Sequence, residues 1–438
     1  MTEHESTTTV LRKNKKVLIA SLTGSAIEWF DYFLYGTAAA LVFNKIFFPM
    51  VDPVIGLILS YLSFSLTFFI RPIGGVLFAH IGDRIGRKKT LVLTLSLMGG
   101  ATVMIGLLPT YEMIGLWAPA LLILMRIIQG MGIGGEWGGA LLLAYEYAPE
   151  KRKGFFGSIP QAGVTIGMLM ATFIVSLMTL FSEADFLSWG WRIPFLFGCL
   201  IVPFIFFLRR KLEETEEFSA RRHHLEMRQV FKTLLANWQV VVAGMLMVAM
   251  TTTAFYLITV YAPTFGKKVL MLSASDSLLV TLLVAISNFI WLPVGGALSD
   301  RFGRKPVLIA MTLLALATSY PALTLLASAP SFSMMLSVLL WLSFLYGLYN
   351  GAMIPALTEI MPAEVRVAGF SLAYSLATAV FGGFTPVMST ALIEYTGDKA
   401  SPGYWMSFAA VCALLATLYL YRRRAVSLQN TVKSEGAV

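Results

Sequence analysis

The stretch GDRIGRK at residues 82–88 recurs as SDRFGRK at residues 299–305. The two copies are separated by about half of the chain, and each follows the second apolar segment in a set of six. A repeat in equivalent loops indicates that the chain consists of two related halves. We therefore predict two structurally similar bundles of helices that pack against each other.

The composition identifies the chain as a membrane protein. Of its 438 residues, 57% are hydrophobic and 13% are charged, against about 25% charged residues in a typical soluble domain. A membrane-spanning helix needs about 20 mostly apolar residues. Such segments cover residues 18–43, 54–81, 88–109, 117–145, 155–181 and 191–208, and then 237–262, 273–297, 305–328, 333–357, 367–394 and 403–421. We predict an all-α membrane protein with twelve transmembrane helices in two pseudo-symmetric six-helix bundles.

The basic residues predict the orientation of these segments. Twelve spans place both termini on one side, and 26 of the 33 Lys and Arg residues then fall on that side, against five on the other. Because cytoplasmic loops carry the excess of positive charge, we expect both termini to be cytoplasmic. The resulting units are an N-terminal tail (1–17), an N-terminal bundle (18–208), a linker (209–236), a C-terminal bundle (237–421) and a C-terminal tail (422–438).

The repeated loops have a composition that suits a conformational latch. The glycines permit tight turns, and the aspartates can pair with arginines or with a helix N-terminus. We interpret the loops as a gating motif at the cytoplasmic ends of the bundles, formed by Asp83, Arg84, Gly86, Arg87, Asp300, Arg301, Gly303 and Arg304. The alternative is that the loops only fix the topology through their positive charge, but charge alone requires neither the glycines nor the aspartates.

Five charged side chains fall deep inside the predicted spans, all of them in the first half, namely Glu28, Asp31, Arg71, Arg126 and Glu136. Such residues are costly in hydrocarbon and are usually functional. An unmatched buried carboxylate takes up a proton, and here three acids accompany two guanidinium groups. We predict that Asp31, with Glu28 and Glu136 as further candidates, carries an exchangeable proton. Arg71 and Arg126 would pair with these acids or bind a substrate carboxylate.

Two alternatives remain for these charged residues. The five side chains could form a static salt-bridge network that holds the helices together. Glu136, which is nearer to the cytoplasmic side, could instead serve in packing or gating.

The second half offers polar but uncharged side chains at mid-depth. Tyr256, Asn288 and Asn350 are the predicted substrate contacts, because an amide or hydroxyl deep in a span is costly without a partner. Hydrogen bonding between neighbouring helices is the alternative for each of them.

Several functional classes are disfavoured by the sequence. The two cysteines lie in apolar segments, none of the four histidines lies deep in a span, and the phosphate-binding pattern GxxxxGK[ST] does not occur. We therefore expect no enzymatic activity, no cofactor and no metal site. The basic residues form neither a single face nor a tail, so a nucleic-acid partner is not expected.

The paired DRxGRK loops resemble the signature of the major facilitator superfamily. Within it, EWFDYFLYG (28–36), FIRPIGG (69–75) and RIIQGMGIGGEWGG (126–139) resemble the metabolite–proton symporter branch, which includes carriers for shikimate, 2-oxoglutarate, citrate and betaine-type osmolytes. In the second half, MTTTAFYLITVYAPTFG (250–266) and YNGAMIPALTEIMP (349–362) are most similar to citrate–proton symporters. The GGEWGG segment, however, is closer to shikimate-type carriers.

This resemblance implies a proton-coupled secondary transporter in a bacterial inner membrane. It would import a small organic acid by alternating access, with citrate or a related tricarboxylate as the first candidate. Shikimate, a dicarboxylate such as 2-oxoglutarate, or a betaine-type solute are the alternatives, and an uncoupled facilitator is an alternative of another class. The expected partners are the organic anion, protons and the lipid bilayer, and we expect a monomer.

Overall fold

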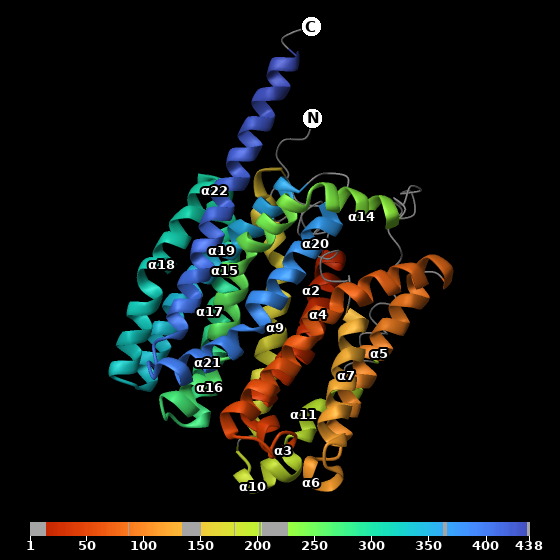
Figure 1. Ribbon diagram of the computed structural model, residues 1–438, viewed down its shortest axis with the longest axis vertical. Coiled ribbons are helices and arrows are strands. Elements are labelled where there is room, and N and C mark those ends of the chain that lie inside the picture. Colours follow the sequence, from red (N-terminus) through yellow and green to blue (C-terminus); the bar gives the residue numbers. More distant parts are fainter. Residues whose placement is uncertain are drawn as a thin grey trace.

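The computed structural model describes residues 15–85, 87–133, 150–178, 180–200, 203, 227–361 and 366–435. Within these ranges the chain forms helices and no β-strand, and the long helices run side by side (Figure 1). Helices suit a bilayer because each one satisfies its own backbone hydrogen bonds. Eight of the described helices are long and apolar enough to cross a membrane, and Ser96–Leu107 and Trp117–Ile133 are shorter apolar helices. The predicted all-α membrane fold is confirmed, whereas the number of twelve spans stays a prediction.

Among its described residues, the first half contains five long helices and several short ones. The long helices are α2 (Lys15–Ala38), α4 (Pro53–Ile85), α5 (Arg87–Leu107), α7 (Trp117–Ile133) and α9 (Lys153–Met178). The short segments are η1 (Ala39–Phe43), α3 (Asn44–Ile46), α6 (Tyr111–Ile114), η2 (Glu150–Arg152), α10 (Glu183–Asp185), η3 (Phe186–Gly190) and α11 (Arg192–Leu196). The candidate Glu136 lies outside the described residues.

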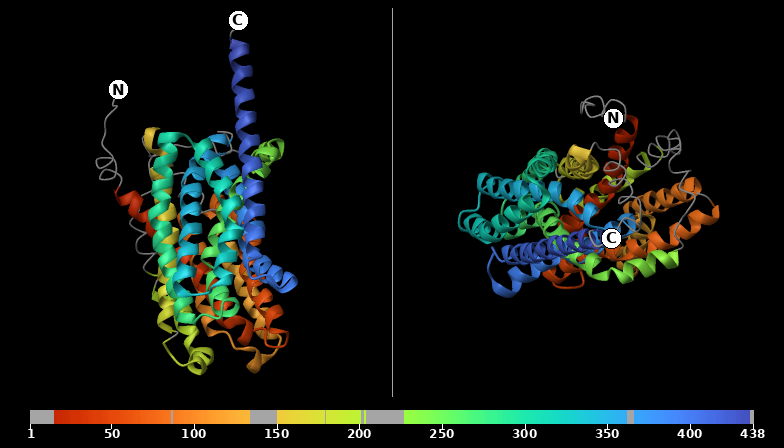
Figure 2. Two further views of the ribbon diagram at one scale, coloured as in Figure 1. Left: turned by 90° about the vertical axis from the view of Figure 1, so that its left-hand side faces the viewer. Right: turned by 90° about the horizontal axis from the view of Figure 1, so that it is seen from above.

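The amphipathic helix α14 (Met227–Ala236) lies in the predicted linker and leads into the second half. The chain continues with α15 (Trp238–Ile258), α16 (Ala262–Thr264), η4 (Phe265–Val269), α17 (Ala274–Phe302), α18 (Arg304–Ser328), α19 (Phe332–Ile360), α20 (Arg366–Ala377), η6 (Thr378–Gly383), α21 (Thr385–Thr396) and α22 (Pro402–Glu435). The last helix extends past its predicted span and projects far beyond the bundle (Figure 2). Helix α2 begins at this same end, which we call the terminal end (Figure 1).

Helices of each half pack mainly on one another. In the first half, α2 packs on α9, and α4 and α5 pack on α7; in the second half, α17 packs on α19, and α15 and α18 pack on α22. The halves meet where α9 contacts α17 and α19, and where α4 contacts α20, η6 and α21. Glycines allow the closest approach: a Cβ atom on Gly296 of α17 would lie 2.5 Å from the carbonyl oxygen of Gly154 on α9.

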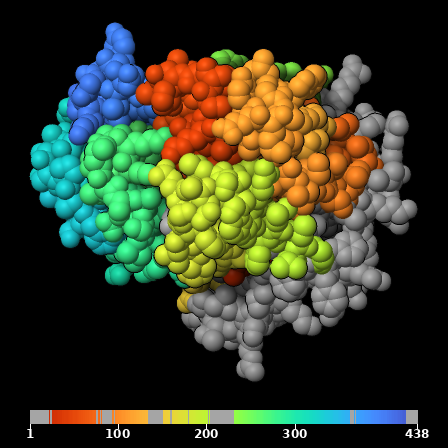
Figure 3. Space-filling view, turned by 90° about the horizontal axis from the view of Figure 1, so that it is seen from below, coloured from red at the N-terminus to blue at the C-terminus, as the bar shows by residue number. Residues whose placement is uncertain are grey.

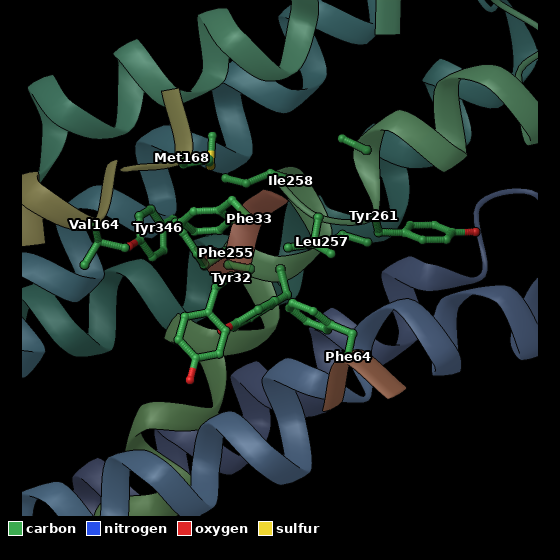
Figure 4. Close-up of a cluster of buried hydrophobic side chains, with 14 of the residues drawn as sticks. Tyr32, Phe33, Phe64, Val164, Met168, Phe255, Leu257, Ile258, Tyr261 and Tyr346 are labelled. Carbon is green, nitrogen blue, oxygen red and sulfur yellow. The ribbon is translucent and has the colours of Figure 1, made fainter. Parts of the chain in front are cut away.

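Aromatic side chains fill the middle of the boundary between the halves (Figure 4). The rings of Phe33 and Phe255 lie 5.5 Å apart, and those of Phe64 and Tyr256 lie 5.8 Å apart, both edge to face. Such pairs stabilise a contact beyond the apolar area that they bury. The two halves are therefore in close contact at the centre in this conformation.

Candidate functional site

A chain of three buried hydrogen bonds starts at Asp31 of α2. Its Oδ2 accepts a hydrogen bond from Thr102 Oγ1 at 2.8 Å. Thr102 Oγ1 accepts one from Gln129 Nε2 at 2.8 Å, and Gln129 Oε1 accepts one from Arg126 Nη1 at 2.8 Å. Every donor in this relay points toward Asp31, which suits an ionised carboxylate because it can only accept. The Thr102 hydroxyl has a second acceptor within reach, since the carbonyl oxygen of Met98 lies 3.1 Å away.

Arg126 on α7 is held in place by α4. Its Nε donates to the carbonyl of Ser63 at 3.2 Å, and its Nη2 donates to the carbonyl of Phe64 at 2.9 Å and to Thr67 Oγ1 at 3.1 Å. The ring of Tyr35 lies 3.7 Å from the guanidinium carbon. The side chain is 1% exposed. The structure thus links Arg126 to Asp31 through an amide and a hydroxyl, where the sequence predicted a direct pairing with an acid or a substrate.

Arg71 on α4 lies among aromatic rings from α2 and α4. Its guanidinium carbon lies 4.7 Å from the ring centre of Tyr32, 5.3 Å from that of Trp29 and 5.4 Å from that of Phe68. Its Nε donates to the Tyr32 hydroxyl at 3.1 Å. Although the residue is only 6% exposed, its Nη2 has no hydrogen-bond partner among the described atoms. A buried donor without a partner costs about 1–3 kcal/mol or more when it is charged, so this atom suits an acceptor from a ligand.

Glu28 lies one helical turn before Tyr32 and is also buried. The two acids of α2 thus have different surroundings: Glu28 lies one turn from Tyr32, whose ring packs on Arg71, and Asp31 ends the relay from Arg126.

A small cavity lies between the two halves. Its lining comes from α2, α9, α15, α19, α20 and η6 and consists of Trp29, Gln161, Val164, Thr252, Phe255, Tyr256, Tyr346, Tyr374 and Thr378. It holds about 10 Å³, which is close to the smallest space that accommodates one water molecule. Trp29 lines this cavity and also packs against the guanidinium of Arg71. A larger ligand can bind here only when the halves move apart.

The three substrate contacts predicted in the second half lie in three different environments. Tyr256 lines the cavity, and its hydroxyl has no hydrogen-bond partner among the described residues. Asn350 lies behind the lining, where its Nδ2 donates to the Tyr346 hydroxyl at 3.1 Å. Asn288 does not line the cavity, and its Oδ1 accepts a hydrogen bond from Ser343 Oγ at 2.5 Å between α17 and α19.

Three polar residues at this site were not predicted as site residues. Gln161 of α9 places its Nε2 3.5 Å from the Tyr374 hydroxyl of α20, and its Oε1 has no partner among the described atoms. Thr102 and Gln129 form the relay described above. Gln161 and Gln129 carry the same signal that selected Asn288 and Asn350, an amide deep inside a span. A single threonine such as Thr102 carries no comparable signal.

The second copy of the gating motif joins the two halves at the terminal end. Asp300 accepts hydrogen bonds from the backbone nitrogens of Gly154 at 3.0 Å and Phe155 at 3.2 Å, at the start of α9. Arg304 Nη1 lies 2.5 Å from the Asp300 carboxylate, and Gly303 forms the turn with a φ of 91°. Arg301 is exposed and approaches the ring of Phe302.

The first copy is described only in part. Helix α4 ends at Ile85 and α5 begins at Arg87, whereas Gly86 and the side chains of Asp83, Arg84 and Arg87 lie outside the described residues. Within the described part of the chain, no three His, Cys, Asp or Glu side chains come together as metal ligands.

Comparison with known proteins agrees with this fold. The sequence matches the family model of the Major Facilitator Superfamily over residues 21–377 and 270–437. It is 67% identical to a citrate-proton symporter of Klebsiella pneumoniae, over 93% of this chain and 92% of that protein. A citrate-proton symporter of Salmonella typhi is 50% identical over 92% of both chains. The crystal structure of a D-xylose-proton symporter has a TM-score of 0.72 at 21% identity, over 92% of this chain and 96% of that one. The chain therefore belongs to the major facilitator superfamily, as its paired loops predicted.

Proposed function

We propose that this protein is a proton-coupled symporter that imports citrate or a related tricarboxylate through a bacterial inner membrane. The observation that carries the proposal is the 67% identity to a citrate-proton symporter over nearly the whole chain. The buried acid and the buried, partly unpartnered guanidinium of the first half supply the chemistry that such an activity needs. Shikimate is the second candidate, because the GGEWGG segment resembles shikimate-type carriers.

We further propose the complete twelve-span topology. The four spans beyond the eight long apolar helices would be formed by α2, α5, α7 and residues 191–208, which gives bundles at 18–208 and 237–421. The linker (209–236) and both tails would then be cytoplasmic, in agreement with the distribution of basic residues. The similarity of fold to the D-xylose symporter supports this arrangement. One chain would suffice for transport, because the central cavity lies between halves of the same chain.

Proton transfer would take place at Asp31. When Asp31 is ionised, the Thr102 hydroxyl donates to it, and Gln129 and Arg126 complete the relay. When Asp31 gains a proton, it no longer attracts this donor, and Thr102 can turn to the carbonyl of Met98. Protonation would thereby loosen α2 from α5 and α7, which allows the bundles to rearrange. Glu28 and Glu136 remain the further candidates for this role.

Substrate binding would centre on Arg71. Its Nη2 is free to donate to a carboxylate, and arginine binds carboxylates in a planar, two-pronged geometry. Tyr256 and Gln161 line the central cavity, which Trp29 separates from Arg71, and they could donate to, or accept from, the remaining polar groups of the substrate. Binding from both halves would favour the closed state once the substrate is in place.

Uptake into proteoliposomes tests this function. An imposed inward proton gradient should drive accumulation of labelled citrate by the wild-type protein, and Asp31→Asn should abolish this accumulation while citrate counterflow persists. Uptake that ignores the proton gradient would indicate an uncoupled facilitator instead. Thermal-shift measurements with citrate, tricarballylate, 2-oxoglutarate, shikimate and betaine would rank the substrates, and a larger shift with shikimate than with citrate would contradict the proposed substrate.

A further inference from the structure

Three lysines gather around the boundary between the halves at the end opposite to the termini. Lys45 lies in α3 of the first half, and Lys267 and Lys268 lie in η4 of the second half. The segments that lead into them are in contact, because α16 packs against η1. Figure 3 shows the chain around residues 45, 185 and 265 side by side on this face. In the proposed orientation this face meets the periplasm.

In the described residues, one carboxylate forms an ion pair with these lysines. Glu183 of α10 places its Oε1 2.8 Å from Lys45 Nζ. The hydrogen bond and charge of Lys45, together with the charge of Lys267, lower the pKa of Glu183, so this side chain is ionised at neutral pH. Partial burial and the charges of Lys45 and Lys267 lower the pKa of Lys268 to about 8. At pH 7 the group therefore holds three cations and one anion.

The Lys45–Glu183 pair is suited to exchange. Its side chains are 42% and 68% exposed, and ion pairs in contact with water contribute little to stability. A carboxylate that arrives from solution can therefore replace Glu183 at Lys45 without disrupting the fold.

The closed contact between the halves lies next to this group. The hydroxyls of Tyr61 on α4 and Thr264 on α16 share a hydrogen bond, and the rings of Tyr61 and Tyr261 lie 6.4 Å apart. Thr264 directly precedes η4, which carries two of the lysines. A substrate that enters from this face, along a path between α3 and η4, would pass the three lysines on its way to the central cavity.

We propose that Lys45, Lys267 and Lys268 form an external docking site for a polycarboxylate, in which Glu183 occupies Lys45 until the substrate displaces it. This inference rests on the proposed import of an organic anion. The excess of positive charge raises the local concentration of a multiply charged anion and the rate at which it binds. It also favours a trianion over a monoanion, because the attraction grows with the charge of the ligand.

Initial rates of citrate uptake test the docking site. In the double variant Lys267→Gln/Lys268→Gln, we expect the KM to rise about threefold to tenfold at low ionic strength with an unchanged maximal rate. The difference from wild type should vanish near 1 M salt, where the screening length falls to about 3 Å. Glu183→Gln should lower the KM, because it frees Lys45.

Lys399→Gln is the matched control, since Lys399 is an exposed lysine in the turn between α21 and α22 at the same end. Its KM should equal that of wild type. A double variant with a wild-type KM at low salt, or an equal rise of KM in Lys399→Gln, would overturn the docking site. If the wild-type protein takes up no citrate at all, the proposed substrate fails; if it takes up citrate and the variants match it, only the docking site fails.

Discussion

Among the described contacts, the hydroxyl of Thr102 connects Asp31 to Gln129 and Arg126. Thr102→Val keeps the shape of the side chain but removes the donor to the carboxylate. A hydrogen bond to a charged group contributes about 1.5–3 kcal/mol, so we expect proton-driven uptake to fall by about tenfold or more, with counterflow retained. Thr102→Ser should restore the driven uptake. Equal driven uptake by Thr102→Val and wild type would contradict the relay.

The two buried arginines should respond differently to replacement by lysine. The guanidinium nitrogens of Arg126 donate hydrogen bonds to protein acceptors. Because lysine cannot make all of these bonds, Arg126→Lys should lower the melting temperature of the purified protein. Arg71 keeps one donor free, so Arg71→Lys should weaken citrate binding by about tenfold, since lysine lacks the planar two-pronged geometry. Melting curves with and without citrate measure both effects. The prediction fails if Arg71→Lys binds citrate as tightly as wild type.

Lys268 gives the docking site a pH dependence. Above pH about 8 this lysine loses its charge, so the KM for citrate should rise. The charge of Lys268→Arg persists at these pH values. The other charged groups around position 268 are Lys267, Lys45, Glu183 and Asp276 in the first turn of α17; they are common to both proteins. The ratio of the wild-type KM to the variant KM should therefore increase between pH 7 and 9, and a constant ratio would refute the role of Lys268.

At the scale of elements, the contact of α9 with α17 holds the two halves together at the terminal end. In Gly296→Ala the new Cβ would lie 2.5 Å from the carbonyl oxygen of Gly154, and overpacking of this kind costs about 1–3 kcal/mol. The variant should therefore favour a conformation in which the two helices separate. Electron paramagnetic resonance distances between spin labels at positions 152 and 301 would report this shift. Gly100→Ala is the control, since its Cβ meets no atom within 4 Å.

The elements themselves were largely predictable from the sequence. The predicted segments 305–328 and 333–357 correspond to α18 (Arg304–Ser328) and α19 (Phe332–Ile360), because the thickness of the bilayer dictates the length of an apolar run. The extension of α22 to Glu435 was not predicted. Its polar residues carry no membrane signal, although they are compatible with a helix.

Most of the candidate residues that the sequence singled out in the first half are charged, and Tyr256 is an uncharged candidate that lines the cavity. Asp31 and Arg71 were selected because an ionisable group in hydrocarbon is energetically costly and is therefore usually functional. Asn288 was selected on the same argument as an amide, but its partner is Ser343 on the neighbouring helix. The sequence of an apolar span gives little information about which face of the helix packs against which neighbouring helix. The sequence could not place Gln161 at the cavity or join Thr102 to Asp31, since these contacts arise when separate helices pack.

At the scale of the whole molecule, the proposed alternating access requires the halves to separate at one end at a time. The two ends use different chemistry in the described residues: an aspartate bound to helix backbone at the terminal end, and a tyrosine–threonine contact beneath lysines at the other. Release of one contact need not weaken the other, which is the condition for alternating access.

The small size of the central cavity limits the leakage of protons through this part of the protein. A space for about one water molecule between the described residues leaves no room there for the unbroken file of waters along which hydrogen ions hop. At this point between the described residues, the closed state of the proposed symporter would therefore interrupt a proton path through its centre, which would help a cell to keep the gradient that powers uptake.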